Sequence, residues 1–585
     1  MIQNKLRLLG EQCAKRFYPA LWQCIKEGYS AKTFATDTLA GIIVAAVALP
    51  LAIAFSIAAG LPPQAGLITA VIAGFAISAF GGCRVQVGGP TGAFIVIIYG
   101  IYSQYGVEGL TLATLMAGII LVALGFCGLG SIIKYIPYPV TIGFTSGIAL
   151  IIFAGQIEAL LGLDCRSALQ LENLAKMPGD FIGKLSVYTH AITTINLWSV
   201  LLSGSTVLIC IFWRKVTQRI PGSIIAILLT TAVVQLFNLD VPTIGKLFPS
   251  VAQGMEIPFP QMPDFHWETV RALVSPAIAI ALLAGIESLL SAVVADGMTG
   301  RRHNSNTELI GQGIANILSP LFGGIPATGA IARTATNIKN GGKTPVAGII
   351  HALILLFVML FLGKYAAMIP MATLGGVVAI VAYNMSGWHL VKGLLKSTRS
   401  DVLVMVVSFS LTVLVDLTVA IQAGVLLAAF LFIRRMSEST EARDITHLLA
   451  TGDEPNGTLP DDLGQPGIDI PEYVEVFEIQ GALFFGAADK FKDTLLSHSR
   501  RFPKVLILRM RHVLTLDATA LHSLEEVYAH THAKGIQLVL SGVTAQPLVL
   551  MVRAGFLDKI GQENVHNHIS GAIARARELV SAENI

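Results

Sequence analysis

The chain contains few charged residues. Asp, Glu, Lys and Arg make up 13% of its 585 residues, whereas hydrophobic residues make up 54%. Soluble globular domains carry about 25% charged residues, so this composition excludes an ordinary soluble enzyme. The formal net charge of +3 is too small to indicate a nucleic-acid partner, because nucleic acids attract concentrated basic surfaces.

Motifs for catalysis are also missing. The six cysteines form no CxxC pair and lie in or near apolar stretches, which indicates small apolar side chains rather than a disulfide or metal set. We find no ATP-binding P-loop, no nucleophile–base constellation and no metal-ligand spacing, so we expect no enzymatic activity and no cofactor. The first 36 residues hold several Lys and Arg but no long apolar core, so no cleavable signal peptide is expected.

Long apolar runs dominate the chain from Asp37 to Arg435. A helix that spans a bilayer requires about 20 mostly apolar residues, and the runs predict fourteen membrane segments, of which the third and the tenth are half-length. Fourteen segments divide into two repeats of seven, and a repeat with an odd number of segments is inverted relative to its copy. The expected segments are 37–59, 65–81, 91–103, 108–127, 137–160, 195–213, 222–238, 272–295, 310–323, 329–338, 345–362, 371–391, 400–416 and 417–436.

Two interrupted apolar segments carry nearly the same letters. Phe-Gly-Gly at 80–82 and Thr-Gly-Ala at 91–93 recur as Phe-Gly-Gly at 322–324 and Thr-Gly-Ala at 328–330. Broken segments at corresponding places in two halves are typical of a transporter's midplane site. Half-helices that begin at the two threonines would each direct an N-terminus, with its NH groups and a charge of about +0.5, at one point that attracts an anion. The alternative interpretation is two ordinary Gly/Pro loops between spans.

The distribution of basic residues predicts the orientation in the membrane, because cytoplasmic loops are enriched in Lys and Arg. With both termini cytoplasmic, the inner loops carry Arg301, Arg302 and Lys343, whereas the outer loops 161–194 and 239–271 are acidic.

The chain changes character after the last apolar run. Gly and Pro are frequent at 452–466 and indicate a linker, and strands then alternate with helices as in a small α/β domain with a partly parallel sheet. Strands are expected at 473–479, 483–485, 505–508 and 537–541, and helices at 487–499, 517–532 and 545–554. The predicted organisation is a cytoplasmic segment 1–36, a transmembrane domain 37–436, a linker 437–469 and an α/β domain 470–585.

Several motifs resemble one family over essentially the whole chain. Pro-Leu-Ala-Ile-Ala-Phe at 50–55, Ile-Glu-Ser-Leu-Leu-Ser at 286–291, Glu-Leu-Ile-Gly-Gln-Gly at 308–313 and Ala-Arg-Thr at 332–334 are similar to spans of the SulP family, the sulfate permeases with a C-terminal STAS domain. The letters around Glu287 are most similar to the bacterial dicarboxylate-type branch.

The resemblance implies an architecture and a location. Segments 1–4 and 8–11 would form a substrate-carrying core and segments 5–7 and 12–14 a gate, with an elevator movement in a homodimer of the bacterial inner membrane. The 470–585 domain would be a cytoplasmic STAS domain that regulates transport, binds a cytosolic partner or supports dimerisation. Ala518 stands where related STAS proteins carry a phosphorylated serine, so that switch is absent at this position.

Glu287 is the acidic residue deepest in an expected span. A carboxylate at the bilayer centre costs about 2.5–3.5 kcal/mol on insertion scales, so it must face a cavity or be neutral. We predict that Glu287 couples transport to protons, being protonated with the anion bound and deprotonated on return. Ser291 lies on the same helix face at i+4 and is assigned to ion coupling with it. The alternative is a structural carboxylate paired permanently with a base.

Arg333 follows the second Thr-Gly-Ala, where its guanidinium could hold carboxylate or sulfate oxygens bidentately or neutralise Glu287; a purely structural role is the alternative. Phe55 lines the same pocket by resemblance, with ordinary helix packing as the alternative. The candidate substrate-binding residues are Phe55, Thr91, Gly92, Ala93, Ser288, Thr328, Gly329, Ala330 and Arg333.

These features predict a secondary active anion transporter that is coupled to H+, and the resemblance implies sulfate or a C4-dicarboxylate as its substrate. In Na+-coupled bicarbonate relatives, the acid and hydroxyl corresponding to Glu287 and Ser291 bind Na+ together with groups of the tenth segment. Ile331 stands where that branch is expected to have threonine, which favours H+. The alternatives are a Na+-coupled bicarbonate symporter, a passive anion channel on the same scaffold and a membrane receptor.

Overall fold

The computed structural model describes residues 17–131, 137–165, 169, 177–178, 180–216, 221–249, 251, 255–415, 417–451, 469–498 and 503–582. The chain divides into two compact units, Met1–Leu426 and Leu427–Ile585. Most of the expected linker, 452–468, and the first part of the expected N-terminal segment, 1–16, lie outside the described residues.

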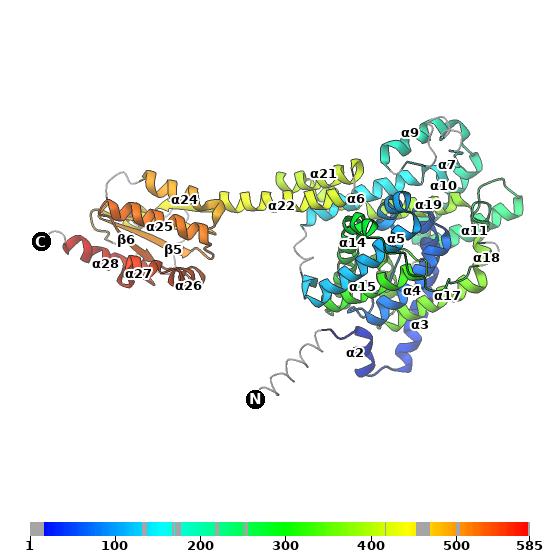
Figure 1. The fold of residues 1–585 in the computed structure, drawn as a ribbon, viewed down its shortest axis with the longest axis horizontal. Helices are drawn as coiled ribbons and strands as arrows, with labels where there is room; N and C mark the ends of the chain where they lie inside the picture. The colour runs from blue at the N-terminus through cyan, green and yellow to red at the C-terminus, as the bar shows by residue number, and fades with distance from the viewer. Residues whose placement is uncertain are drawn as a thin grey trace. The chain divides into compact units, whose positions relative to one another are not determined.

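The first unit is built from helices (Figure 1). Its first half contains α2 (Ala20–Lys26), α3 (Ala31–Ala58), α4 (Pro63–Phe80), η1 (Gly92–Phe94), α5 (Ile95–Phe126), α6 (Tyr138–Gly155), α7 (Ile157–Leu161), α9 (Phe181–Ala191), η3 (Ile192–Thr194), α10 (Leu197–Val216) and α11 (Gly222–Phe237). Its second half contains α12 (Ile244–Leu247), α14 (Trp267–Thr299), α15 (Ser305–Leu321), α16 (Ile331–Lys339), α17 (Val346–Phe357), η4 (Val358–Leu362), α18 (Gly363–Ala366), α19 (Met371–Met385), α20 (Trp388–Leu394) and α21 (Arg399–Leu414). The helix α22 (Leu417–Ser439) follows.

Within the described residues, eight helices are long and apolar enough to cross a membrane, or nine if the bent pair around Ile195 is one span. Shorter helices, among them α11, α15, α16 and α21, occupy the other expected positions. The number of fourteen crossings stays a prediction, since length and composition do not decide how a short helix sits in a bilayer.

A glycine separates the third and fourth expected segments. The helix α5 runs through both of them, but Gly106 interrupts it with φ 68° and ψ −166°. A residue with a Cβ rarely adopts this conformation, whereas glycine does so at no steric cost. The half-length third segment therefore ends where the sequence offers a glycine.

The helices pack in two groups. In the first group, α15 packs against α4 and α5, α14 against α5 and α16, and α17 against α3 and α4. In the second group, α6 packs against α21 and α19, and α10 packs against α11 and α19. The two groups correspond to the expected core and gate segments. In Figure 1, α4, α5 and α15 lie together on the visible face of the first unit.

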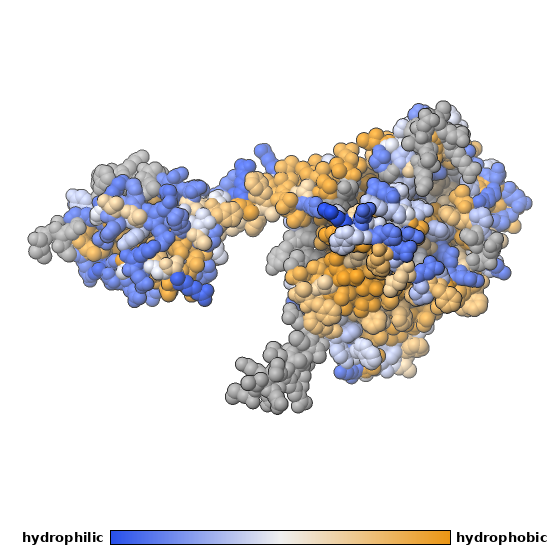
Figure 2. Space-filling model, viewed as in Figure 1, coloured by the Kyte–Doolittle hydropathy of each residue, from blue (hydrophilic) through white to orange (hydrophobic). Residues whose placement is uncertain are grey.

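The surface of the first unit is largely hydrophobic where these helices face outward. Figure 2 shows hydrophobic residues over α4 and α15, and hydrophilic residues gathered around α2. An apolar belt of this kind fits a surrounding of lipid, because a soluble protein rarely exposes large contiguous apolar patches.

The second unit contains a five-stranded sheet in the order β3-β4-β5-β6-β7. The strands are β3 (Glu441–Asp444), β4 (Val474–Gln480), β5 (Val505–His512), β6 (Gln537–Ser541) and β7 (Val565–His566). The pair β3–β4 is antiparallel and the other pairs are parallel. The helices are α23 (Thr446–Thr451), α24 (Phe485–His498), α25 (Ala518–Ala533), α26 (Ala545–Arg553), α27 (Phe556–Ile560) and α28 (Ile569–Ala582), with the short turn η5 (Gln562–Asn564).

One expected strand of the second unit is wrong. The segment 483–485 contributes only an isolated bridge from Leu483 to Leu516, and α24 already begins at Phe485. The carboxylate of Asp517 accepts hydrogen bonds from Phe485 N at 2.9 Å and from Ala520 N at 2.8 Å. One side chain therefore satisfies donors in the first turns of two helices, which ends the strand pairing at this point.

Candidate anion-binding site

The two interrupted segments meet in the middle of the first helix group. Their short strands β1 (Gly88–Gly89) and β2 (Thr328–Gly329) pair antiparallel, with Gly88 opposite Gly329 and Gly89 opposite Thr328. The first half-helix begins at Gly92 after Thr91 as N-cap. The expectation that the second begins at Thr328 is wrong: Thr328 and Gly329 belong to β2, Ala330 N donates to Val87 O at 3.0 Å, and α16 begins at Ile331.

The first segment contacts Glu287 through Thr91. The Thr91 hydroxyl donates a hydrogen bond of 2.9 Å to Oε2 of Glu287, which lies on α14. The Glu287 side chain is partly exposed, whereas its neighbours Ile286 and Ser288 are buried. The structure thus places the acid predicted for ion coupling at the N-terminus of the first half-helix.

Phe55 and Gly92 lie beside this contact. Phe55 is buried in α3, and a Cβ built at Gly92 would lie 3.6 Å from Phe55 Cε1. Ala93 is buried in the first turn. The aromatic side chain therefore packs close to the N-terminus of the half-helix, and its role in lining a substrate pocket stays a prediction.

The second segment makes different contacts with α14. The Thr328 hydroxyl donates to the main-chain oxygen of Ala284 at 2.8 Å and is fully buried. Ala284 precedes Glu287 by one helical turn, so both threonines of the repeated motif contact the same stretch of α14. Only the first of them contacts a titratable group.

Arg333 points toward the first segment. Its Nη2 donates to Pro90 O at 2.9 Å and its Nη1 to Gly88 O at 3.4 Å, and the residue is 1% exposed. A Cβ at Gly89, where φ is 146°, would overlap Arg333 Nη1. Among the described residues, Arg333 and Glu287 form no ion pair. The guanidinium therefore supports the backbone before the first half-helix and leaves a buried positive charge beside it.

Ser288 belongs to a buried polar network rather than to the surface beside Glu287. Gln86 Nε2 donates to Ser288 Oγ at 2.8 Å, and Ser288 Oγ donates to Glu308 Oε1 at 3.1 Å. Glu308 Oε1 also accepts from Gln312 Nε2 at 2.8 Å. A Cβ at Gly329 would overlap Gln86 Nε2, so glycine is required for this close approach.

Glu308 was missed as a site residue by reasoning from the sequence. The ninth segment was expected to begin at 310, but α15 begins at Ser305, because the Asn304 side chain accepts from the NH groups of Asn306 and Thr307. Glu308 is therefore inside the helix and fully buried, and its Oε2 accepts from Gly82 N and Cys83 N at 2.9 Å each. The N-cap signal of Asn304 would have revealed the earlier start.

Ser291 is not brought to Glu287. Its hydroxyl donates to Thr334 Oγ1 at 3.2 Å, and Thr334 Oγ1 also accepts from Val87 N at 3.1 Å. Ser291 and Thr334 are buried between α14, α16 and the backbone before β1. The hydroxyl assigned to ion coupling thus belongs to a hydrogen-bond chain that connects α14, α16 and the backbone before β1.

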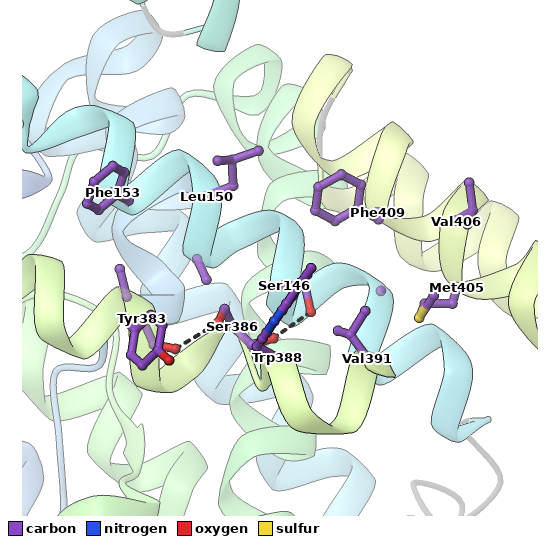
Figure 3. A pocket seen from close by; sticks show the side chains of 13 residues that line it. Ser146, Leu150, Phe153, Tyr383, Ser386, Trp388, Val391, Met405, Val406 and Phe409 are labelled. Atoms are coloured by element: carbon purple, nitrogen blue, oxygen red, sulfur yellow. Dashed lines mark hydrogen bonds between the residues drawn. The ribbon is translucent and has the colours of Figure 1, made fainter. Parts of the chain in front are cut away.

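A separate apolar cavity of about 530 Å³ lies between α6, α19, α20 and α21 (Figure 3). Ser146 Oγ donates to Ser386 O at 2.8 Å, and Ser386 Oγ donates to Tyr383 O at 2.7 Å. Its remaining lining is mostly aliphatic or aromatic, including Phe153, Trp388 and Phe409. Because no lining residue is charged, this cavity does not suit a hydrated anion.

Metal ligation finds no support in the part of the chain that the structure describes. No group of three or more His, Cys, Asp or Glu side chains that could hold a metal ion occurs there. The arrangement offers instead half-helix NH groups, a buried guanidinium and one partly exposed carboxyl group.

Known proteins are similar to this chain in sequence. The Sulfate permease family matches residues 34–408, and the STAS domain matches residues 465–572. The "Putative sulfate transporter YvdB" of Bacillus subtilis is 41% identical over 93% of this chain and 98% of that protein. The "Bicarbonate transporter BicA" of Synechocystis sp. is 31% identical over 92% of this chain and 94% of that protein.

Solved structures show the same fold. The transmembrane domain of a cyanobacterial bicarbonate transporter BicA matches with a TM-score of 0.58 and 32% identity, covering 68% of this chain and 98% of that domain. The structure of SLC26A9 matches with a TM-score of 0.83 over 99% of this chain and 95% of that one, and at 17% identity it shows the fold alone. The chain is therefore a multi-pass membrane protein of the sulfate permease (SulP) family of anion transporters, with a C-terminal STAS domain.

Proposed function

We propose that this chain is a secondary active transporter that carries a small anion together with H+, with sulfate or a C4-dicarboxylate as substrate. The contact between Thr91 and Glu287 carries the proposal, because it places a titratable acid at a helix N-terminus that attracts anions. The anion binds next to Gly92 and Ala93, with Phe55 as part of the wall.

The charge balance links the proton to the anion. An ionised Glu287 beside the half-helix repels an incoming anion, and the low-dielectric surroundings strengthen this repulsion. Protonation of Glu287 removes the repulsion and leaves the positive charge of Arg333 and the NH groups of the half-helix. The anion and the proton therefore bind together, and the anion's departure favours release of the proton.

Transport follows when the core group of helices moves against the gate group. The moving part is the helix group that carries α14, α16 and both interrupted segments, so the site travels with its own contacts. We place the protein in the bacterial inner membrane as a homodimer with both termini cytoplasmic, where the STAS domain binds a cytosolic partner or regulates transport.

A Na+-coupled bicarbonate symporter is the second candidate, since the relatives named BicA are bicarbonate transporters. Na+ requires several oxygen ligands, but Ile331 supplies none from its side chain and the Ser291 hydroxyl is engaged with Thr334. H+ coupling requires only the carboxyl group of Glu287. A passive channel is the third candidate, and it predicts no uptake against a gradient.

Uptake into proteoliposomes tests the proposal. The purified protein is reconstituted, and uptake of radiolabelled sulfate, succinate and bicarbonate is measured with pH and Na+ gradients applied separately. We expect an inward proton gradient to drive accumulation of sulfate or succinate, and Glu287→Gln to abolish the dependence on that gradient. Glu268→Gln, which alters an exposed acid at the start of the same helix, is the matched control.

Three results would contradict the proposal. Accumulation driven by Na+ but not by H+ would favour the bicarbonate-type candidate. Uptake that never exceeds equilibrium would indicate a channel. An unchanged pH response in Glu287→Gln would remove Glu287 from proton coupling.

A further inference from the structure

A polar cavity of about 360 Å³ lies at the C-terminal end of α16. Its walls are the segment Cys83–Val85 that leads to β1, the end of α14 at Asp296 and Thr299, the turn 301–303 and the turn Gly341–Lys343 after α16. The expected orientation of the chain places this cavity at the cytoplasmic face. It is separate from the contact between Thr91 and Glu287.

Positive charge exceeds negative charge in this cavity. Arg84, Arg301, Arg302 and Lys343 line it. Arg84 is paired with Glu27, and Oδ2 of the acid Asp296 lies 2.7 Å from Nδ1 of His303. Among the described residues, Arg301, Arg302 and Lys343 form no direct ion pair, although Arg301 interacts at longer range with the carboxylate of Glu27. The side-chain charges of Arg302 and Lys343 have no partner there.

These cations do not cap the nearby helix ends by hydrogen bonds among the described residues. Helix C-termini attract Lys and Arg because their last carbonyl groups carry partial negative charge. At the end of α14, however, Gly300 N donates to Asp296 O, and after α16 Gly342 N donates to Asn337 O. These bonds satisfy one carbonyl group at each helix end, and the side chains of Arg301, Arg302 and Lys343 donate no hydrogen bond to the remaining ones among the described residues.

We propose that this cavity binds a phosphate group, from an anionic lipid headgroup or from free phosphate. Arginine presents a planar fork of donors that matches phosphate oxygens, and Lys343 adds a point charge from the turn after α16. The volume lies within the range of about 300–1,000 Å³ usual for small-ligand sites. This inference does not rest on the substrate or on the coupling ion.

The helix α2 lies close to the cavity and exposes apolar side chains that suit a membrane surface. It packs against α4, and Ala20 N donates to Gly81 O at 2.9 Å, directly before the cavity wall. Trp22 and Ile25 of α2 are about half exposed, and tryptophan is enriched where a membrane meets water. Basic clusters at the cytoplasmic face bind anionic headgroups, which makes a lipid phosphate a suitable ligand.

Occupancy of the cavity would act on the central segments. Asn337 Nδ2 donates to Val85 O at 2.8 Å, and Cys83 N donates to Glu308. A phosphate that bridges the turn 301–303 and Lys343 would hold the end of α16 against the segment that leads to β1. We therefore expect ligand binding to raise the thermal stability of the full-length protein.

Native mass spectrometry of the full-length protein in detergent tests the site. The probes are dioctanoyl phosphatidic acid, dioctanoylglycerol as the same lipid without phosphate, and inorganic phosphate as competitor. Each guanidinium–phosphate interaction corresponds to about tenfold in affinity, so R301A/R302A should weaken phosphatidic acid binding at least tenfold. R301K/R302K should retain most of the binding, and K392A/K396A, which removes two basic residues outside the cavity, should leave it unchanged.

The competitor identifies the source of the phosphate. Displacement of the lipid by inorganic phosphate shows that a free phosphate suffices, and failure of displacement shows that the lipid headgroup is the ligand; both support the site. Equal binding of phosphatidic acid to the wild type and R301A/R302A overturns it, as does equal binding of dioctanoylglycerol. If R301A/R302A does not fold, Lys343→Ala gives the same test from the turn after α16.

Discussion

The two interrupted segments have nearly the same sequence, but their threonines contact different groups. Thr91 donates to the carboxyl group of Glu287, whereas Thr328 donates to the main-chain oxygen of Ala284 one turn earlier on the same helix. Both threonines contact α14, as expected for corresponding positions of a repeat. The residue that each threonine meets on α14 decides its role, and only the first meets an acid.

A second difference lies one turn further along each segment. Arg333 stands at the position that Val96 occupies in the first segment, counted from the Thr-Gly-Ala motif. Its guanidinium crosses to the first segment and donates to Gly88 O and Pro90 O. The second segment thus supports the first, and the first supplies the contact with the titratable group.

Replacement of Arg333 should produce the largest effect. Arg333→Ala leaves two buried carbonyl groups without these donors, at a cost of about 1–3 kcal/mol each. We expect a clear drop in the midpoint of thermal unfolding in detergent. Val96→Ala, at the corresponding position of the first segment, should cost less than half as much. Equal destabilisation by the two variants would show that the hydrogen bonds from Arg333 to the first segment contribute little to stability.

Replacement of Gly89 should produce an intermediate effect. In Gly89→Ala the new Cβ overlaps Arg333 Nη1 in a backbone conformation that suits glycine, and overpacking costs about 1–3 kcal/mol. Gly100→Ala is the matched control, because a Cβ there meets nothing within 4 Å, and alanine in a helix gains about 0.5–1 kcal/mol over glycine. Thermal unfolding should therefore shift in opposite directions. A shift in the same direction would contradict the close approach of Arg333.

Replacement of the two threonines should produce the smallest effect on stability and the sharpest functional contrast. Thr91→Val and Thr328→Val each remove one hydrogen bond, worth about 0.5–1.5 kcal/mol. We expect only Thr91→Val to change the dependence of anion uptake on pH, because only Thr91 contacts Glu287. Uptake into proteoliposomes across a series of external pH values measures this. A matching change in Thr328→Val would make the two segments functionally equal.

Much of this molecule is determined by its sequence alone. The apolar runs predict the helices, because a helix that spans a bilayer requires a long apolar stretch. The repeated Thr-Gly-Ala motif predicts that the two broken segments meet, and the pairing of β1 with β2 confirms it. Glu287 is distinguished by its depth in a span, and the alternating strands and helices predict a small α/β domain, which the family resemblance identifies as a STAS domain. These features depend on local composition and spacing, which the chain displays directly.

The tertiary structure decided which atoms meet. The approach of Thr91 to Glu287, the reach of Arg333 to the opposite segment and the burial of Ser288 between Gln86 and Glu308 join residues far apart in the chain. The start of α16 at Ile331 instead of Thr328 follows from strand pairing with the other half. Such contacts depend on how helices pack and on which rotamers the packing allows, and no local pattern in the sequence encodes either.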